Sequence, residues 1–235
     1  YFTGEGGYFN VATGRAHRTF EAYAPLIPIN APAVLSNGAA IYDFQTDRLL
    51  EQTTLPETAP LDLGELMEAF PSLALEVYYG EDIYVCRPNE ITFAHMRKVG
   101  CSYTQRPMGE LPTPWVKALF HQEREVLLPV QARLLEKFGG RYEAIFSNPR
   151  YLEITRKGST KGGMVARVAQ MLGVAREHIY CVGDNQNDIT MLELSAIPFA
   201  PADCAREVRE WGARLLCPCA GGVIGDIVDI LDQMY

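Results

Sequence analysis

The order of short apolar segments along the chain most constrains its fold. Near the C-terminus a helical segment at 161–172 is followed by a strand-like segment at 178–182, and such alternation is typical of a parallel α/β sheet. In the middle, strand-like segments 73–79 and 82–87 are adjacent, and a helical segment at 90–99 follows. Adjacent strands favour antiparallel hairpins. We therefore predict an α/β protein with a doubly wound parallel sheet core and an inserted α+β domain.

The points where this pattern changes give the expected domain boundaries. We expect residues 1–54 to form the first part of the core, 55–155 the inserted domain, and 156–235 the second part of the core. Residues 8–12 are predicted to form a core strand and residues 188–195 a helix. In a sheet split this way, ligands bind above the carboxyl ends of the strands, between the two parts.

Charge and composition narrow the function further. The net charge is −8, so no broad basic surface exists to bind nucleic acid, and an anionic ligand needs a local cluster of donors. No apolar run approaches the roughly 18 residues that cross a bilayer, which argues against a membrane protein. The six cysteines are scattered through apolar contexts. This usage is typical of reduced core residues and predicts a cytoplasmic location.

The strongest chemical signal lies in Ile179-Tyr-Cys-Val-Gly-Asp-Asn-Gln-Asn-Asp188. A buried strand runs into Gly183, and a tight loop then carries Asp184 and Asp188. Two carboxylates four residues apart at a strand end suit a hard cation such as Mg²⁺, with Asn187 as a neutral polar neighbour. The alternative is that Asp188 only caps the following helix, but this does not explain the whole cluster. We predict a metal site.

Two further motifs are suited to phosphate. Lys161, in Lys157-Gly-Ser-Thr-Lys161, falls in the first turn of a helix, where the dipole disfavours a cation unless an anion lies nearby. A solvated loop lysine is the alternative. Thr13-Gly14-Arg15 follows a strand and offers a hydroxyl and an unobstructed backbone N–H, a small phosphate cradle. Each motif is weak alone, and together they suit phosphoryl transfer.

In this order the motifs resemble the haloacid dehalogenase superfamily, specifically Cof-type phosphatases of subclass IIB with a large α/β cap on a Rossmann-like core. By resemblance, Thr13 is the phosphate-binding hydroxyl and Lys161 the phosphate-binding lysine. Asp184 and Asp188 match the acidic pair of the fourth motif, with Asp184 the expected direct Mg²⁺ ligand. Asn37, in Ser-Asn-Gly-Ala, matches the turn after the second core strand. The resemblance implies catalytic roles for Lys161, Thr13 and Asp188.

The sequence departs from this family in one respect. The family's first motif, Asp-x-Asp-Gly-Thr, supplies the nucleophilic aspartate and an acid/base aspartate, and no such string occurs here. Tyr1-Phe-Thr-Gly-Glu-Gly-Gly7 looks like a helix end with a glycine cap. We therefore expect the motif upstream of Tyr1, and expect a chain that starts at Tyr1 to be inactive.

The resemblance implies a Mg²⁺-dependent phosphatase that hydrolyses small phosphoesters, such as a sugar phosphate, through an aspartyl-phosphate. Two alternatives stay open. A phosphohexomutase-like enzyme would transfer the phosphate to a sugar, and a non-catalytic protein would only bind phospho-ligands. The expected partner is a small phosphorylated metabolite. The sequence does not decide between a monomer and a dimer.

Overall fold

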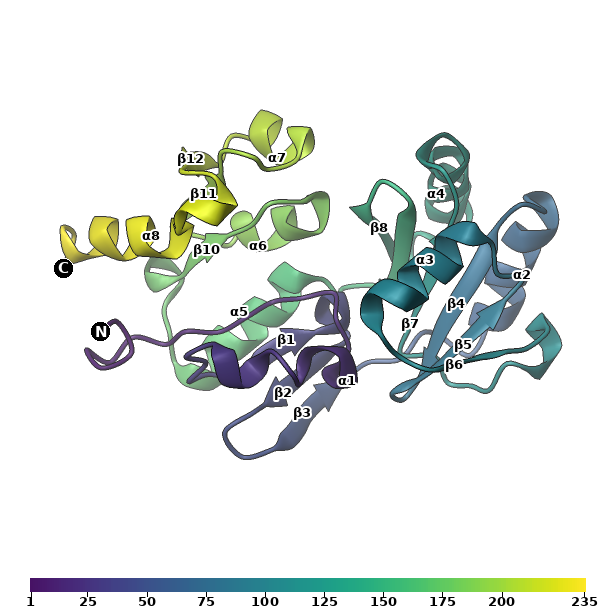
Figure 1. Cartoon of the computed structure of the whole chain (residues 1–235), viewed down its shortest axis with the longest axis horizontal. Helices are drawn as coiled ribbons and strands as arrows, with labels where there is room; N and C mark the ends of the chain where they lie inside the picture. Colours follow the sequence, from purple (N-terminus) through teal and green to yellow (C-terminus); the bar gives the residue numbers. More distant parts are fainter.

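The computed structural model describes residues 1–235 and contains three β-sheets. Two small sheets of three strands each lie in one half of the molecule, and a six-stranded sheet lies in the other (Figure 1). The six-stranded sheet is formed by the middle of the chain, and the small sheets by the segments before and after it. This arrangement confirms the predicted α/β fold class, a core with an inserted α+β unit.

The first small sheet is an antiparallel meander of β1 (Ala33–Leu35), β2 (Ala40–Asp43) and β3 (Arg48–Gln52). The predicted strand at 8–12 is wrong in extent, because only Ala12 pairs, through one parallel bridge to Val34. The backbone nevertheless runs alongside β1, since the Thr13 N–H donates to the Val34 carbonyl at 2.8 Å. This pairing sets the Thr13-Gly14 turn next to the end of β1.

The second small sheet is parallel, with β11 (Ile197–Pro201) between β10 (Tyr180–Val182) and β12 (Arg214–Leu216). The helix predicted at 188–195 is shorter than expected. A 3₁₀ turn (Gln186–Asp188) leads into α6 (Ile189–Leu192). The helix begins later than predicted because Asp188, the first residue of the predicted helix, belongs to the Asp184–Asp188 loop. The other helices of this half are α1 (His17–Phe20), α5 (Lys161–Leu172), α7 (Arg206–Trp211) and α8 (Val223–Asp232).

One apolar cluster joins the two small sheets. Val165 and Val168 of α5 pack with Val34 and Ile41 of the first sheet and with Cys181 of the second. Burying side chains of this size stabilises a fold by about 1.5–3 kcal/mol each. Helix α5 therefore holds the first and second parts of the core together.

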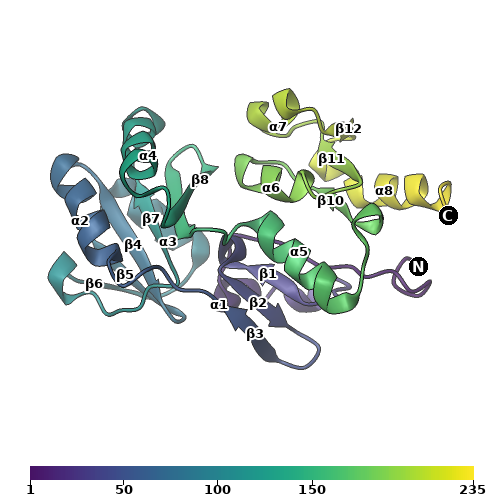
Figure 2. The same ribbon diagram turned by 180° about the vertical axis from the view of Figure 1, so that it is seen from behind.

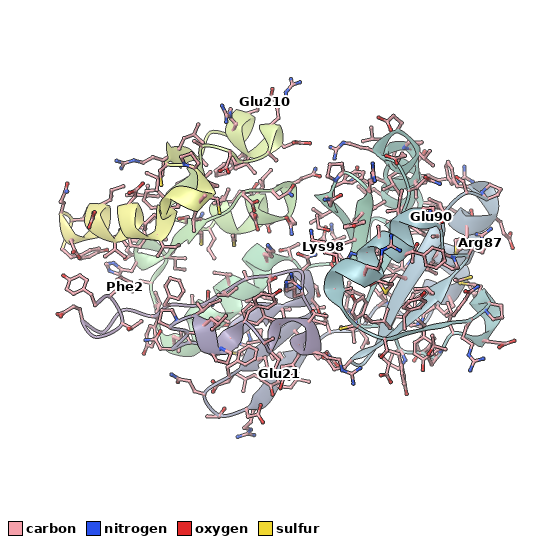
Figure 3. The ribbon with its side chains drawn as sticks, viewed as in Figure 1. Phe2, Glu21, Arg87, Glu90, Lys98 and Glu210 are labelled. Atoms are coloured by element: carbon pink, nitrogen blue, oxygen red, sulfur yellow. The ribbon has the colours of Figure 1, made fainter.

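The six-stranded sheet has the order β6-β5-β4-β7-β9-β8 and is antiparallel except for the β5–β6 pair. Its strands are β4 (Ala74–Tyr79), β5 (Asp82–Cys86), β6 (Tyr103–Gln105), β7 (Lys117–His121), β8 (Tyr142–Asn148) and β9 (Tyr151–Arg156). Helices α2 (Ala59–Ala69) and α4 (Arg124–Phe138) pack on one face, and α3 (Glu90–Val99) lies on the other (Figures 1 and 2). Glu90 and Lys98 mark the two ends of α3 (Figure 3).

The two faces of this sheet differ sharply. The face under α2 and α4 is apolar and includes Phe120 and Leu152 in a cluster of 22 buried residues. The opposite face combines a smaller apolar cluster, which includes Tyr78 and Leu119, with four buried acidic or basic side chains. We call it the charged face after these four: Glu76, Lys117, His121 and Glu153. These residues share one side because directly paired positions of antiparallel strands point the same way, and Leu119 pairs with both Glu76 and Glu153.

Helix ends follow local signals. Asn89 caps α3 by accepting the Thr92 N–H at 3.0 Å, and Gly100 ends it in the left-handed region with φ +69°. Both choices satisfy backbone groups that a helix terminus leaves unpaired. No helix in this structure combines the length and the apolar character that a bilayer-spanning segment requires.

Candidate functional site

The Asp184–Asp188 loop is closed by its own acidic side chain. Asp188 Oδ2 accepts the backbone N–H groups of Asp184 at 2.9 Å and of Asn185 at 3.0 Å. Gly183 is required here, since a Cβ atom at this position would lie 2.3 Å from the Cβ of Asp188. Asp188 is therefore buried and fixed, whereas Asp184 reaches solvent at the loop surface.

Lys161 meets this loop from the start of α5. Its Nζ lies 2.5 Å from Asp188 Oδ1, and both side chains are buried. Thr160 caps the helix by accepting the Gly163 N–H at 3.0 Å. A Cβ at Gly162 would lie 2.0 Å from the Thr190 carbonyl oxygen, so glycine lets α5 approach α6 closely enough for this ion pair. The alternative of a solvated Lys161 does not hold.

The turn after β1 brings an amide to the same place. Asn187 Nδ2 donates to Asn37 Oδ1 at 2.9 Å. Asn37 Nδ2 is buried without a well-formed hydrogen bond, near the Glu153 carboxylate. Ser36 and Asn37 both adopt left-handed backbone conformations, with φ +52° and +56°. Such strain concentrates at functional sites. An unsatisfied buried N–H donor beside a lysine suits an anionic oxygen.

The Thr13-Gly14 turn is hydrogen-bonded to the turn after β1, which carries Asn37. The Asn37 N–H donates to the Thr13 carbonyl at 3.0 Å, and Thr13 Oγ1 accepts the Arg15 N–H at 3.2 Å. A Cβ at Gly14 would lie 3.0 Å from Asn37 Nδ2, so Thr13, Gly14 and Asn37 are neighbours. The Arg15 guanidinium instead lies over the Tyr23 ring, 4.8 Å from its centroid.

A small cavity marks where the parts meet. Its volume of about 10 Å³ is room for about one water molecule. Its walls come from both parts of the core and from the six-stranded sheet: Asn37, Ile145, Glu153, Thr155, Lys161 and Asn187. The sequence prediction includes Asn37, Lys161 and Asn187 but misses the other three. No local motif marks them, because they come together only through the register of β8 with β9.

Glu153 is the most consequential of the residues that the sequence prediction missed. It forms a buried ion pair with Lys117, whose Nζ lies 3.1 Å from Glu153 Oε2 and also donates to the Gly14 carbonyl at 2.9 Å. Burial, the largest single influence, raises the pKa of Glu153, but the Lys117 ammonium together with hydrogen bonds from Ser147 and Asn37 holds that pKa below its ordinary value. The charged face thus contacts the Thr13-Gly14 turn directly.

The donor set fits a hard cation at Asp184. Partial burial and the neighbouring Asp188 carboxylate raise the pKa of Asp184, and a cation would relieve this repulsion. Both Asp188 oxygens already accept hydrogen bonds, one from Lys161 and one from two backbone N–H groups. Asp184 is therefore the better candidate for a direct ligand, and metal ligation by Asp188 stays a prediction.

Comparisons with known proteins identify the family and several relatives of this chain. Residues 1–211 match the family model of haloacid dehalogenase-like hydrolases. YxeH of Bacillus subtilis is 26% identical over 215 residues, which cover 88% of this chain and 78% of YxeH. The pyridoxal phosphate phosphatase YbhA of Escherichia coli is 25% identical over 219 residues, covering 87% of this chain and 80% of YbhA.

Solved structures show the same fold. A subclass IIB sugar phosphatase of the haloacid dehalogenase superfamily superimposes with a TM-score of 0.84 at 18% identity, over 98% of this chain and 87% of that one. These findings confirm the resemblance inferred from the motifs. With a family model that spans most of its length, the chain belongs to the haloacid dehalogenase-like hydrolases.

Proposed function

We propose that this protein is a Mg²⁺-dependent phosphatase that hydrolyses small phosphate monoesters. The observation that carries the proposal is the convergence of four segments far apart in sequence. The Lys161–Asp188 ion pair lies in the loop that carries the exposed Asp184 carboxylate. Asn187 of the same loop hydrogen-bonds Asn37, whose backbone N–H donates to the Thr13-Gly14 turn. A phosphoryl group needs this combination of positive charge and N–H donors.

In this proposal each residue has a distinct task. Lys161 neutralises charge on the phosphoryl oxygens, and Asp188 keeps its ammonium in place. Asn37 Nδ2, which has no well-formed hydrogen bond and lies near the Glu153 carboxylate, donates to a phosphoryl oxygen. The Thr13 hydroxyl and the Gly14 N–H complete the cradle. Arg15 positions the Thr13 hydroxyl through its backbone N–H, and Asn187 orients the Asn37 amide.

Asp184 would hold Mg²⁺, and this ion supplies charge neutralisation for an in-line displacement when bound. By resemblance, the attacking group is an aspartate carboxylate, which would form an aspartyl-phosphate as the alcohol leaves, and water would then hydrolyse that intermediate.

We further propose that residues 55–155 act as a cap between core segments 1–54 and 156–235. Lys117 and Glu153 place cap charges beside the phosphate cradle, so closure of the cap would exclude water from the reacting group. The relatives named as phosphatases of pyridoxal phosphate and of 5-amino-6-(5-phospho-D-ribitylamino)uracil support a small phosphorylated metabolite as substrate. The six unpaired cysteines support a cytoplasmic location.

The test is phosphate release from a panel of small phosphoesters, including pyridoxal 5′-phosphate and several sugar phosphates, with and without Mg²⁺. We expect release that requires Mg²⁺. Asp184→Asn should lower kcat/KM by at least about a hundredfold, comparable to losing one major transition-state contact. Asp229→Asn, at an exposed position of α8, is the matched control and should behave like the native protein.

Two results would count against the proposal. Equal activity of Asp184→Asn and the native chain would remove the metal site from the reaction. Absence of phosphate release from every ester, with Mg²⁺ bound, would replace the phosphatase with a phosphotransferase or a binding protein.

A further inference from the structure

A second cluster of metal-ligating groups lies in the six-stranded unit, outside the phosphatase site. Glu76 of β4, His121 of β7 and His95 of α3 each offer one ligand atom, and these atoms all lie within 4.8 Å of one another. Glu76 and His121 are fully buried, and the His95 side chain is 13% exposed. Helix α3 covers this part of the sheet (Figure 1).

The hydrogen-bond partners of His121 allow a metal-binding state. The Thr92 hydroxyl has one proton to donate and lies 3.1 Å from Asn89 Oδ1 and 3.0 Å from His121 Nδ1. When that proton goes to Asn89, Thr92 accepts from the His121 Nδ1–H, and the lone pair of Nε2 points the other way.

That lone pair faces a carboxylate. His121 Nε2 lies 3.3 Å from Glu76 Oε2, and His95 Nε2 lies 3.6 Å from the same oxygen. Both Glu76 oxygens, His121 Nε2 and His95 Nδ1 are buried without a hydrogen-bond partner. Buried polar atoms without partners are costly. With the His121 proton on Nδ1, the lone pairs of Nε2 and of Glu76 Oε2 repel unless a further proton or a metal ion lies between them.

The spacing suits one metal ion. Ligands at about 2.0–2.2 Å from a tetrahedral ion are about 3.3–3.5 Å apart, close to the two distances from Glu76 Oε2. Two imidazoles and one carboxylate suit borderline transition metals such as Zn²⁺, whereas Mg²⁺ prefers oxygen ligands. We propose that Glu76, His95 and His121 bind one divalent transition-metal ion of the Zn²⁺ type, with a fourth position open to water.

This ion would tie α3 to strands β4 and β7. Thr92 would act from behind His121, holding its ring through Nδ1, as outer partners of metal-bound histidines do. The site differs in donor chemistry from the Asp184 site and shares no residue with it, so its test is independent of the phosphatase proposal. His95, the least buried ligand, provides the route of entry.

The experiment titrates the metal-free full chain with Zn²⁺ by calorimetry, in excess Mg²⁺ that saturates the Asp184 site. We expect one equivalent of Zn²⁺ to bind. Glu76→Gln and His95→Gln should each abolish this binding, while Asp184→Asn should retain it. Thr92→Val should lower the affinity about ten- to a hundredfold, and Thr92→Ser, which keeps the hydroxyl, should not.

Two control variants test whether other side chains of the chain bind the Zn²⁺ ion. His178→Gln changes an exposed histidine that pairs with Tyr235, and the double variant Cys217→Ser/Cys219→Ser removes the Cys-Pro-Cys thiols. Both should bind Zn²⁺ like the native chain. X-ray absorption of the native Zn²⁺ complex should show two imidazoles and no sulfur, a result that holds even if a ligand variant fails to fold.

Three outcomes would overturn the proposal. One is the absence of Zn²⁺ binding by the native chain in excess Mg²⁺. Another is unchanged binding in folded Glu76→Gln and His95→Gln. The third is an absorption spectrum with sulfur ligands, which would place the ion at the cysteines.

Discussion

The two faces of the six-stranded sheet are built from the same strands but are stabilised by different interactions. On β9, Leu152 points into the apolar cluster under α2 and α4, while the next residue, Glu153, points to the charged face. The apolar face gains free energy from burial. The charged face must offset the desolvation of its ions through pairing. The same sheet therefore stabilises the cap through its apolar face and places the charges of Lys117 and Glu153 beside the candidate site through the other face.

Removal of one buried charge should have the largest effect. Lys117→Met leaves Glu153 buried and unpaired, and we expect the free energy of unfolding to fall by about 3–5 kcal/mol. Chemical denaturation measures this. Lys137→Met is the matched control, since Lys137 pairs with Glu65 at the exposed surface, and it should cost at most about 1 kcal/mol.

The double variant Lys117→Met/Glu153→Leu sharpens the result. It removes both charges, so we expect it to recover most of the stability lost in Lys117→Met. If the single and double variants unfold alike, the Lys117–Glu153 pair does not govern the stability of this face.

On the apolar face, Leu152→Ala should cost about 2–5 kcal/mol, through lost burial and a residual cavity. Since no charge is involved, we expect this loss to be the same at pH 5 and pH 8. Denaturation at both values measures it. A loss that varies with pH would mean that the two faces are energetically coupled.

The smallest expected effect is the acid sensitivity of the charged face. The pKa of Glu153 is lowered from its ordinary value of 4.5, so its contribution to stability is full above that value and is lost as pH falls through the folded pKa. Each unit of lowering corresponds to about 1.4 kcal/mol. Glu153→Gln should flatten stability between pH 5 and pH 3, and a slope equal to that of the native chain would contradict the assignment.

Local signals account for the parts of the fold that the sequence predicts well. The predicted helices 90–99 and 161–172 have the bounds of α3 and α5, because capping by Asn89 and Thr160 and left-handed glycines at 100 and 173 are encoded within each segment. The strand predicted at 8–12 is longer than the observed pairing, because its apolar residues indicate burial but do not determine how many of its backbone groups pair with β1.

Long-range register accounts for what the sequence does not reveal. Lys117 and His121 stand at the two ends of Lys-Ala-Leu-Phe-His. In the sequence they look like the polar ends of a short apolar strand. Their burial beside Glu76 and Glu153 follows only from the pairing of β4, β7 and β9. The motif residues Thr13, Asn37 and Lys161 could be named from order alone, but the ion pair of Lys161 with Asp188 could not.

Contacts between the cap and the core have a consequence for how this protein can change over time. Lys117 donates to the backbone carbonyl of Gly14, Asn185 donates to that of Ser147, and the Arg18 N–H donates to the Glu81 carboxylate. In each bond one partner is main chain, which every residue type supplies, proline's missing N–H excepted. Substitutions at the main-chain partner need not break these bonds. Side-chain pairs also cross this boundary, Arg124 with Glu207 and Arg18 with Asp82. Cap and core can therefore vary separately at the main-chain partners, whereas the two side chains of each such pair must change together.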